Sequence, residues 1–414
     1  MLILAILATS AFAEEVADSR KLSREALDAY KAKNYALFLE KSRAASDLRA
    51  NHPTLLYNLA SALALNGRGG EALDVLERVA AMGMIYEPAK DDDFASIRET
   101  PRFKHVVETF EQNARPTENA TRRFSIVERG IISEGLAFDP KTKRFFVSSV
   151  RNGAIYVRDA NGRVKTLVSD QPRGIFGMAV DASRRRLWAS TSALPQSKTF
   201  READRDHAAV LEIDLDSGKV IRTIAAPDNA KHLFGDVAVA RDGTVYVSDS
   251  DSPTIYVIRR SSMEPLIAGP FASLQGLALS SDEQVLYAAD YSKGVFAIDL
   301  KTRDSRLLPG PANVTLLGVD GLYRSGNGTL IGTQNGTNPQ RVIRIRLAKG
   351  GLAIAGVDSL ASNERDFDDI TLGAVAGSEF CFNATGQWAL FGDDGKPPDP
   401  AKLKPANVLC VDRR

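Results

Sequence analysis

The sequence lacks the charge excess and the short motifs that would point to several common functions. Its 53 lysines and arginines are balanced by 52 aspartates and glutamates, and only two of its 414 residues are cysteines. A net charge of +1, with no basic run interleaved with aromatic residues, argues against a nucleic-acid partner. A Gly-x-Ser-x-Gly elbow, a His-Glu-x-x-His zinc pair and a phosphate loop are also missing. Nucleophilic serine or cysteine catalysis is therefore disfavoured.

Long hydrophobic runs are missing as well. No stretch approaches the roughly 18 apolar residues of a membrane-spanning helix. Residues 1–13 combine a short apolar run with the ending Ala11-Phe12-Ala13, which predicts a signal peptide cut before Glu14, although no lysine or arginine precedes the run. We therefore expect an exported protein, periplasmic or secreted, without a membrane span.

What the sequence does contain is a short cassette that returns at six places. Its second position is a glycine in five copies and an aspartate in one: Gly135, Gly177, Asp236, Gly276, Gly321 and Gly373. Copies about 40–60 residues apart, each followed by strands of period two, predict a six-bladed β-propeller. The sixth blade runs out of sequence after its third strand. We expect residues 124–128 to supply its fourth strand and close the ring.

The residues before the propeller have helical periodicity. Apolar residues recur at three- and four-residue steps through 19–113, with breaks at Asn34 and at 66–70. A polar linker with a proline follows. The predicted fold class is α plus all-β, a small domain of helical hairpin repeats followed by a six-bladed propeller. Its predicted parts are a signal peptide (1–13), a helical domain (14–113), a linker (114–121) and the propeller (122–414).

The helical domain resembles tetratricopeptide repeats. The resemblance rests on two helix pairs at a period of about 34–36 residues, with Leu56-Tyr57-Asn58-Leu59-Ala60, then Gly67, then Glu71-Ala72-Leu73. Stacked helix pairs usually offer a concave surface to a peptide or a protein. A small cap that only packs on the propeller is the equal alternative, so a protein partner at this domain stays open.

The two cysteines, Cys381 and Cys410, both lie in the last repeat. Residues 378–383 and 407–412 are expected to be neighbouring antiparallel strands, in a register that opposes the two cysteines to within one residue. A disulfide is therefore expected in an oxidising compartment. The alternative is a pair of buried thiols that merely pack together.

The first position of the cassette varies and is predicted to line one face of the ring. Around the axis it is occupied by Glu134, Phe176, Gly235 with Asp236 beside it, Gln275, Asp320 and Leu372. Three carboxylates near a narrow axis repel one another and are costly to desolvate unless a cation or a proton holds them. Ligands that are all oxygen favour a hard divalent cation, calcium before magnesium or zinc.

Residues 122–414 resemble the senescence-marker-protein and gluconolactonase family of six-bladed propellers. Glu134-Gly135-Leu136 is similar to the family's Glu-Gly metal-ligand motif, and Asp320-Gly321-Leu322 to its later Asp-Gly motif. The resemblance implies that a divalent cation polarises a lactone carbonyl or activates water. It also implies that Glu134 is a metal ligand and Asp320 both a ligand and the candidate general base.

The two intervening ligand positions depart from the family, which usually has asparagine there. This chain has Gly235 followed by Asp236 at one of them and Gln275 at the other. Asp236 and Gln275 complete the candidate metal set. Asp236 could instead accept hydrogen bonds from backbone amides at the start of the blade.

Several other polar residues have a structural interpretation. Asp249 and Asp290 end second strands, where an aspartate usually caps the next turn. His232 could shuttle protons, but a structural role is favoured. Two long connections, 192–206 and 384–405, are expected to rise over the face that holds Glu134 and Asp320. In the second connection Trp388 and Phe391 either anchor the loop, which is favoured, or contact a ligand.

Two functions of different classes remain open. The first is a divalent-metal-dependent hydrolase of a lactone or a related small ester. The second is a non-catalytic exported scaffold that binds a protein or an envelope component. The retained pair Glu134 and Asp320 favours the first, and the missing asparagines favour the second.

Overall fold

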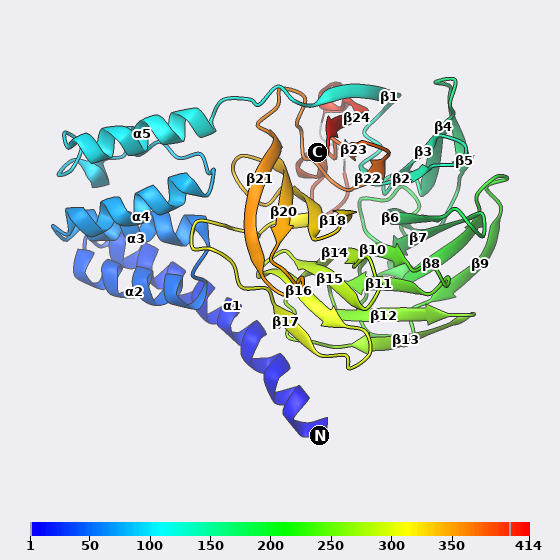
Figure 1. Cartoon of the computed structure of the whole chain (residues 1–414), viewed down its shortest axis with the longest axis horizontal. Helices are drawn as coiled ribbons and strands as arrows, with labels where there is room; N and C mark the ends of the chain where they lie inside the picture. The colour runs from blue at the N-terminus through cyan, green and yellow to red at the C-terminus, as the bar shows by residue number, and fades with distance from the viewer. Residues whose placement is uncertain (1, 397–398) are drawn as a thin grey trace.

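The computed structural model describes residues 2–396 and 399–414, with side chains from Glu14 onward except that of Pro400. Met1, the first residue of the predicted signal peptide, and residues 397–398 of the second long connection lie outside the described part. A helical domain precedes a six-bladed β-propeller (Figure 1), which confirms the predicted fold class. None of the described helices combines the length and the apolar character needed to cross a membrane.

The helical domain contains five α-helices within the described residues. They are α1 (Leu2–Lys31), α2 (Tyr35–Leu48), α3 (Pro53–Leu65), α4 (Gly69–Ala81) and α5 (Pro101–Asn113). The breaks have local causes: Asn34 caps α2 by accepting from the amide of Leu37, and Thr100 caps α5. The domain has its own apolar core, in which Leu63, Leu76 and Phe110 are fully buried. The sequence predicts helical periodicity from residue 19, whereas α1 already begins at Leu2.

Each blade is a four-stranded antiparallel sheet whose first strand lies nearest the axis. Blade 1 contains β2 (Ser133–Asp139), β3 (Arg144–Ser149), β4 (Ala154–Arg158) and β5 (Val164–Val168). Blade 2 contains β6 (Gly174–Asp181), β7 (Arg186–Ser192), β8 (Ala208–Asp214) and β9 (Val220–Ala225). Blade 3 contains β10 (Phe234–Val239), β11 (Val245–Asp249), β12 (Thr254–Arg259) and β13 (Ser262–Ile267). Blade 4 contains β14 (Leu274–Leu279), β15 (Val285–Asp290), β16 (Gly294–Asp299) and β17 (Ser305–Leu307). Blade 5 contains β18 (Val319–Gly326), β19 (Thr329–Gln334), β20 (Arg341–Leu347) and β21 (Ile354–Ser362). Blade 6 contains β22 (Gly373–Ala376), β23 (Glu379–Asn383), β24 (Pro405–Asp412) and β1 (Thr121–Arg129).

The repeated cassette forms a β-bulge. In the inner strands of blades 1 to 5 the pairing register shifts across the first two cassette positions, between Ser133 and Leu136 in β2 and at the matching places in β6, β10, β14 and β18. A bulge leaves residues out of the ladder and redirects their side chains. In blade 1 the second position must be a glycine because a Cβ at Gly135 would overlap the carbonyl oxygen of Phe176 in the next blade. The first position is thereby presented at the axis.

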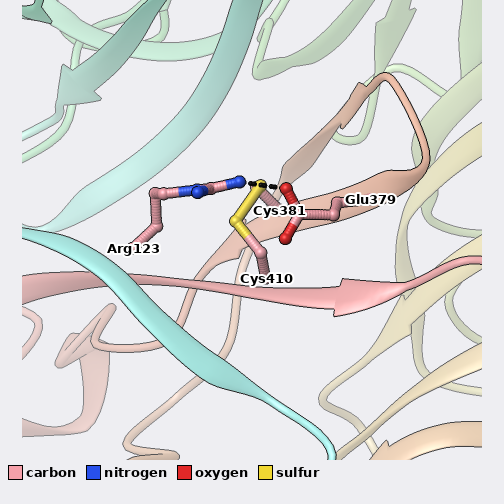
Figure 2. The surroundings of a disulfide bond; sticks show 4 residues. All are labelled: Arg123, Glu379, Cys381 and Cys410. Carbon is pink, nitrogen blue, oxygen red and sulfur yellow. Dashed lines mark hydrogen bonds and ion pairs between the residues drawn. A yellow bond between two sulfur atoms is a disulfide. The ribbon is translucent and has the colours of Figure 1, made fainter.

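The N-terminal strand of the propeller closes the ring, as expected. β1 pairs antiparallel with β24, the third strand of blade 6. Cys381 of β23 lies directly opposite Cys410 of β24, and the two form the expected disulfide, with Cα atoms 4.0 Å apart (Figure 2). Arg123 of β1 forms an ion pair with Glu379 of β23 beside this bridge. The closing strand is therefore fixed by backbone pairing, an ion pair and the covalent bond next to it.

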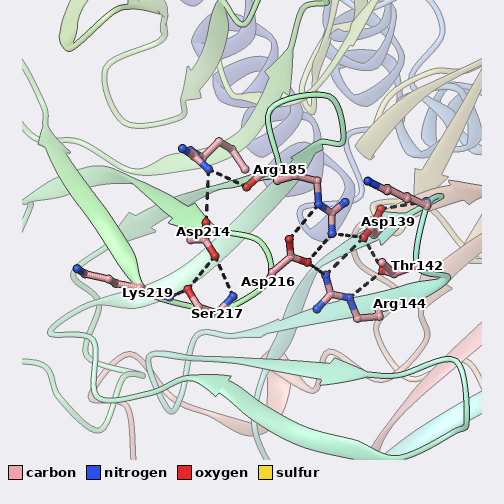
Figure 3. A network of polar contacts seen from close by, with 10 residues as sticks. Asp139, Thr142, Arg144, Arg185, Asp214, Asp216, Ser217 and Lys219 are labelled. Carbon is pink, nitrogen blue, oxygen red and sulfur yellow. Dashed lines mark hydrogen bonds and ion pairs between the residues drawn. The ribbon is translucent and has the colours of Figure 1, made fainter.

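A polar network joins blades 1 and 2 (Figure 3). Asp139, at the end of β2, is completely buried and lies 2.9 Å from the guanidinium of Arg185 in the β6–β7 turn. Arg144 and Arg185 also pair with Asp216, which is 57% exposed, at 2.7 and 2.6 Å. The network connects the β2–β3 turn of blade 1 with the β6–β7 and β8–β9 turns of blade 2 through charge-assisted hydrogen bonds.

The helical domain contacts loops on one face of blades 4 and 5. Arg49 donates to the carbonyl of Ser292 in the β15–β16 loop at 2.7 Å, and Arg341 donates to the carbonyl of Met82 at 2.8 Å. The amide of Ile85 donates to the carbonyl of Asn338 in the β19–β20 loop. Loops that join second to third strands lie on the same face as the starts of the inner strands. The helical domain therefore sits on the face where the first cassette positions emerge.

Candidate functional site

A cavity of about 200 Å³ opens at this face, on the propeller axis. The first cassette positions of all six blades line it, together with residues from the loops above: Glu134, Phe176, Gly235, Asp236, Gln275, Gly276, Asp320, Leu372, Leu194, Leu233, Ser250 and Trp388. Every candidate residue named from the sequence for this ring is thus brought to one cavity. The volume holds about six water molecules or one small organic molecule.

Glu134 is held by blade 6. The residue is 8% exposed, and its Oε2 accepts a hydrogen bond from the indole Nε1 of Trp388 at 2.7 Å. Its backbone carbonyl accepts from the side-chain amide of Asn383 and the hydroxyl of Thr371. The backbone is therefore fixed, and the second carboxylate oxygen, Oε1, accepts no hydrogen bond from the described residues.

Asp320 is oriented by an asparagine of its own blade. Oδ2 of Asp320 accepts from Nδ2 of Asn335 at 2.9 Å, and the same amide nitrogen donates to the carbonyl of Ile370. Within the described residues, Oδ1 of Asn335 is buried and has no hydrogen-bond partner. An amide oxygen left in this way next to a buried carboxylate is a free oxygen donor for a cation or a ligand.

Asp236 and Gln275 lie beside this pair but are oriented differently. Oδ2 of Asp236 accepts from the backbone amide of Leu277 in the next blade at 3.1 Å, and the amide of Asp236 donates to the hydroxyl of Ser248. Asp236 thus makes the backbone contact that was the alternative to metal binding. Gln275 donates weakly to the hydroxyl of Ser273 at 3.4 Å.

The acids of the cavity have raised pKa values. Burial raises the pKa of Asp320 and of Asp236 to about 7. Burial, and then the charge of Asp320, raise the pKa of Glu134 well above its usual value. The described residues that line the cavity include no lysine, arginine or histidine. The negative charge of the cavity is therefore balanced only by protons or by something that binds there.

The chemistry of these donors fits a hard cation, because they are carboxylate and amide oxygens in a buried, negative cavity. The positions of these donors, however, do not form a complete metal site. No three His, Cys, Asp or Glu side chains within 2–396 and 399–414 are grouped so that they could hold a metal ion. Trp388 engages Glu134 and Leu277 engages Asp236. The pair Glu134 and Asp320, with the amide oxygens beside it, is the part of the ring that fits a cation.

The two long connections meet above the cavity. Leu194 of the first and Trp388 of the second line it, and the indole of Trp388 lies 6.1 Å from the ring of Phe176. Gln196 of the first connection donates to the carbonyl of Gly392 in the second. Phe391 is buried under the guanidinium of Arg151, so it anchors the loop as expected, whereas Trp388 also reaches the site.

The remaining sequence candidates are structural. Asp249 accepts from the amides of Leu233, Asp251 and Ser252, and Asp290 from those of Ala272, Ser273 and Ser292, so both cap turns as expected. His232 is buried and its Nδ1 lies 2.6 Å from Oδ2 of Asp249. It does not line the cavity.

Sequence reasoning missed three residues near the acids. Asn335 directly follows the second strand of blade 5, as Ser250 follows that of blade 3, and this equivalence is the signal that could have found it. Asp369 accepts from the amide of Trp388 at 3.0 Å, and its charge raises the pKa of Asp320. Tyr323 is partly buried between blades 5 and 6, and its hydroxyl accepts from the amide of Gly373. The last two positions have no local pattern.

Comparison with known proteins shows the fold of this chain but not its family or its function. No family model and no curated protein sequence matches this chain. Similar solved structures include a luciferin-regenerating enzyme, 16% identical with a TM-score of 0.50 over 72% of this chain and 95% of that one. Regucalcin from Agrobacterium tumefaciens, a calcium-binding protein, is 14% identical with a TM-score of 0.50 over 70% and 95%. A gluconolactonase from Xanthomonas campestris is 15% identical with a TM-score of 0.47 over 70% and 88%.

Proposed function

We propose that the protein is a divalent-metal-dependent hydrolase of a lactone or a related small ester, with its active site in the axial cavity. The observation that carries this proposal is the buried pair Glu134 and Asp320, which faces a cavity of small-molecule size with no cationic side chain among the described residues of its lining. The structurally similar regucalcin is a calcium-binding protein, and it agrees with this proposal in fold alone.

Asp320 is the proposed general base. Without a cation, burial raises its pKa to about 7. A bound cation would lower this pKa again, so that near neutral pH the carboxylate is ionised and can take a proton from water. Asn335 holds Oδ2 and leaves Oδ1 to receive that proton. After the ester bond has broken, the same oxygen returns the proton to the leaving oxygen.

The proposed ligands of the divalent cation, for which calcium is favoured, are Glu134, Asp320 and the carbonyl oxygen of Gln275. Asp236 completes the ring of negative charge. A bound cation supplies polarisation of the substrate carbonyl. Phe176, Leu194 and Leu372 provide the apolar part of the wall, which positions a small ring and excludes water.

The test compares two isosteric variants with one control. Calorimetric titration with calcium chloride and turnover of a panel of small lactones are measured for the wild type, Glu134→Gln and Asp320→Asn. Loss of the ligand charge weakens calcium binding in both variants, and loss of the base lowers turnover by about a hundredfold or more in Asp320→Asn. Glu264→Gln, an exposed acid on β13 paired with Arg259, leaves both unchanged. Wild-type activity retained in both cavity variants contradicts the proposal.

A second function, a non-catalytic scaffold that binds a protein, is favoured by the surface of the helical domain. Leu27 and Tyr30 of α1 and Leu37 of α2 are large apolar side chains exposed by 43%, 37% and 36%. They suit the tetratricopeptide-like docking surface that we propose for this domain. In a pull-down from an envelope extract, the double variant Leu27→Ser and Leu37→Ser is expected to lose a partner that the wild type retains, while lactone turnover stays intact.

A further inference from the structure

A second cavity lies between the helical domain and the propeller, away from the axial site. It is a cleft of about 560 Å³ between α1, the α2–α3 loop and α4 on one side and blades 4 and 5 on the other. The propeller side is formed by residues 292–295, by residues 307–310, 312, 314 and 316–317, and by Ile354. Ligand pockets in proteins typically measure about 300–1,000 Å³ and often lie at such domain junctions. The described residues that line this cleft are all different from those that line the axial cavity.

One wall of the cleft is apolar. Val295, Leu308, Leu316 and Ile354 form its floor and are buried. Leu48 of the α2 end and Leu307 of β17 also line it, yet they remain 39% and 42% exposed. Covering such exposed apolar surface favours the binding of an apolar chain.

The other wall carries cations. Arg49 and Arg78 reach across from the helices and donate to the carbonyls of Ser292 and Ala312 at 2.7 and 2.8 Å. Nε of Arg49 is buried, and the part of the chain that the structure describes offers it no hydrogen-bond acceptor. Lys293 is only 6% exposed and lies 4.0 Å from Glu15.

The cations outnumber the acids in this lining. Its described residues include three cations, Arg49, Arg78 and Lys293, and two acids, Glu15 and Asp47. Burial, and then the charge of Arg20, lower the pKa of Arg49 to about 10. Burial lowers the pKa of Lys293, and the charge of Arg49 lowers it further. Cations held close together out of water are stabilised by an anion.

We propose that this cleft binds a small amphipathic carboxylate, with the anionic group between Arg49 and Lys293 and the apolar chain against Leu307, Leu308 and Leu316. The carboxylate supplies the acceptor that Nε of Arg49 lacks. The apolar chain covers the exposed parts of Leu48 and Leu307. Because the ligand touches both domains, its binding also stabilises their contact. The proposal does not depend on any activity at the axial cavity.

The experiment is calorimetric titration of the full-length protein with octanoate. Octanol and octylammonium, which have the same chain without the anion, are the ligand controls. Octanoate is expected to bind at least about tenfold more tightly than octanol, because a carboxylate makes a stronger hydrogen bond to an arginine than a hydroxyl does. Octylammonium is expected to bind most weakly of the three.

Two variants separate the anion site from the apolar wall. Arg49→Gln should weaken octanoate about tenfold and leave octanol unchanged. Leu307→Trp keeps every cation but fills the cleft, so it should weaken octanoate and octanol alike, which guards against a folding defect of the first variant. Arg102→Gln, which removes an exposed arginine paired with Asp74 and Glu77, should change neither. Equal affinity for the three ligands, no measurable octanoate binding, or octanoate binding unchanged in both cleft variants overturns the proposal.

Discussion

Two sets of buried carboxylates in this protein have opposite pKa shifts. Burial alone would raise the pKa of Asp139, but hydrogen bonds from Arg185, Thr142 and a backbone amide lower it below its usual value. Asp236 and Asp320 have no cation beside them among the described residues of the cavity, and burial raises the pKa of each to about 7. The partner of a buried acid therefore decides whether it serves the fold or remains available for chemistry.

Asp139→Asn is expected to destabilise the propeller. It leaves Arg185 in the blade 1–2 network without its buried carboxylate, and breaking a buried pair from one side costs about 3–5 kcal/mol. Urea unfolding at neutral pH measures the loss. Asp216→Asn removes the exposed partner of the same arginines and should cost less than about 1 kcal/mol. Equal effects of the two variants would show that burial is not the cause.

The pH dependence of Asp139 has a definite sign. Because its folded pKa is lowered, its contribution is present above the ordinary value of 3.8 and is lost as the pH falls toward the folded value. The difference in unfolding free energy between the wild type and Asp139→Asn should therefore shrink as the pH is lowered below about 4.

The axial acids give the opposite pH dependence. With the pKa of Asp236 at about 7 in the folded state and near 3.8 in the unfolded state, the folded protein holds more protons between these values. The free energy of unfolding therefore falls as the pH rises from about 4 to about 7, by up to roughly 1.4 kcal/mol per pH unit for each such group. Asp236→Asn should flatten the fall in melting temperature between about pH 4 and 7, and Glu264→Gln should not. An unchanged slope in Asp236→Asn would contradict the raised pKa.

At the scale of secondary-structure elements, two devices build the axial site. The bulge at the cassettes of blades 1 to 5 directs the first and second positions toward the axis. The 3₁₀ helix Trp388–Leu390 of the second long connection closes the cavity from above. Gln387 holds this helix through hydrogen bonds to both backbone groups of Lys404. A cation bound by both carboxylate oxygens of Glu134 would compete with the indole of Trp388 for Oε2.

Trp388→Phe tests that competition and rests on the proposed function. The variant keeps an aromatic ring near Phe176 but removes the N–H that engages Oε2 of Glu134. Calcium affinity, measured by calorimetry, is expected to rise by about threefold to tenfold, because a hydrogen bond to a carboxylate no longer has to break. Trp188→Phe, in blade 2 and outside the cavity lining, serves as the control. Lower or unchanged affinity in Trp388→Phe would rule the competition out.

At the scale of the whole molecule, two features hold the protein together. They are the closure of the ring by β1 and the contact of the helical domain with the propeller. Blade 6 takes its outer strand from β1, and the disulfide Cys381–Cys410 connects the two strands next to it. The helical domain covers loops of blades 4 and 5, while the two long connections come from blades 2 and 6. We propose that the boundaries expected from the sequence, with a linker at 114–121, apply to the mature protein.

Removing the bridge should weaken the closure of the ring. The double variant Cys381→Ser and Cys410→Ser is expected to lose about 3 kcal/mol of unfolding free energy, because the bridge joins cysteines 29 residues apart and so closes a loop in the unfolded chain. Chemical denaturation measures it, and reduction of the wild type should give a similar loss. A thiol assay on the denatured, unreduced wild type should find no reactive thiol, and two thiols would disprove the bridge.

The sequence by itself determined the propeller, its six blades and the closing strand, and it placed Cys381 and Cys410 on neighbouring strands. These features follow from the period of the cassette and from the alternation of apolar and polar residues along the strands. Both patterns depend on residues that are close together in the sequence. It also brought the six first cassette positions to one face, because a repeated unit places equivalent residues equivalently.

Only the tertiary structure decided what those residues touch. The bulge that redirects Glu134 and Asp320, the indole of Trp388 from a different blade and the support of Asp320 by Asn335 are contacts between side chains, and no periodicity encodes them. The position of the helical domain on the propeller likewise depends on packing between segments that are distant in the sequence, and this position creates the cationic cleft. Local patterns fix the elements of a fold, whereas the chemistry of a site depends on which elements the closed ring brings together.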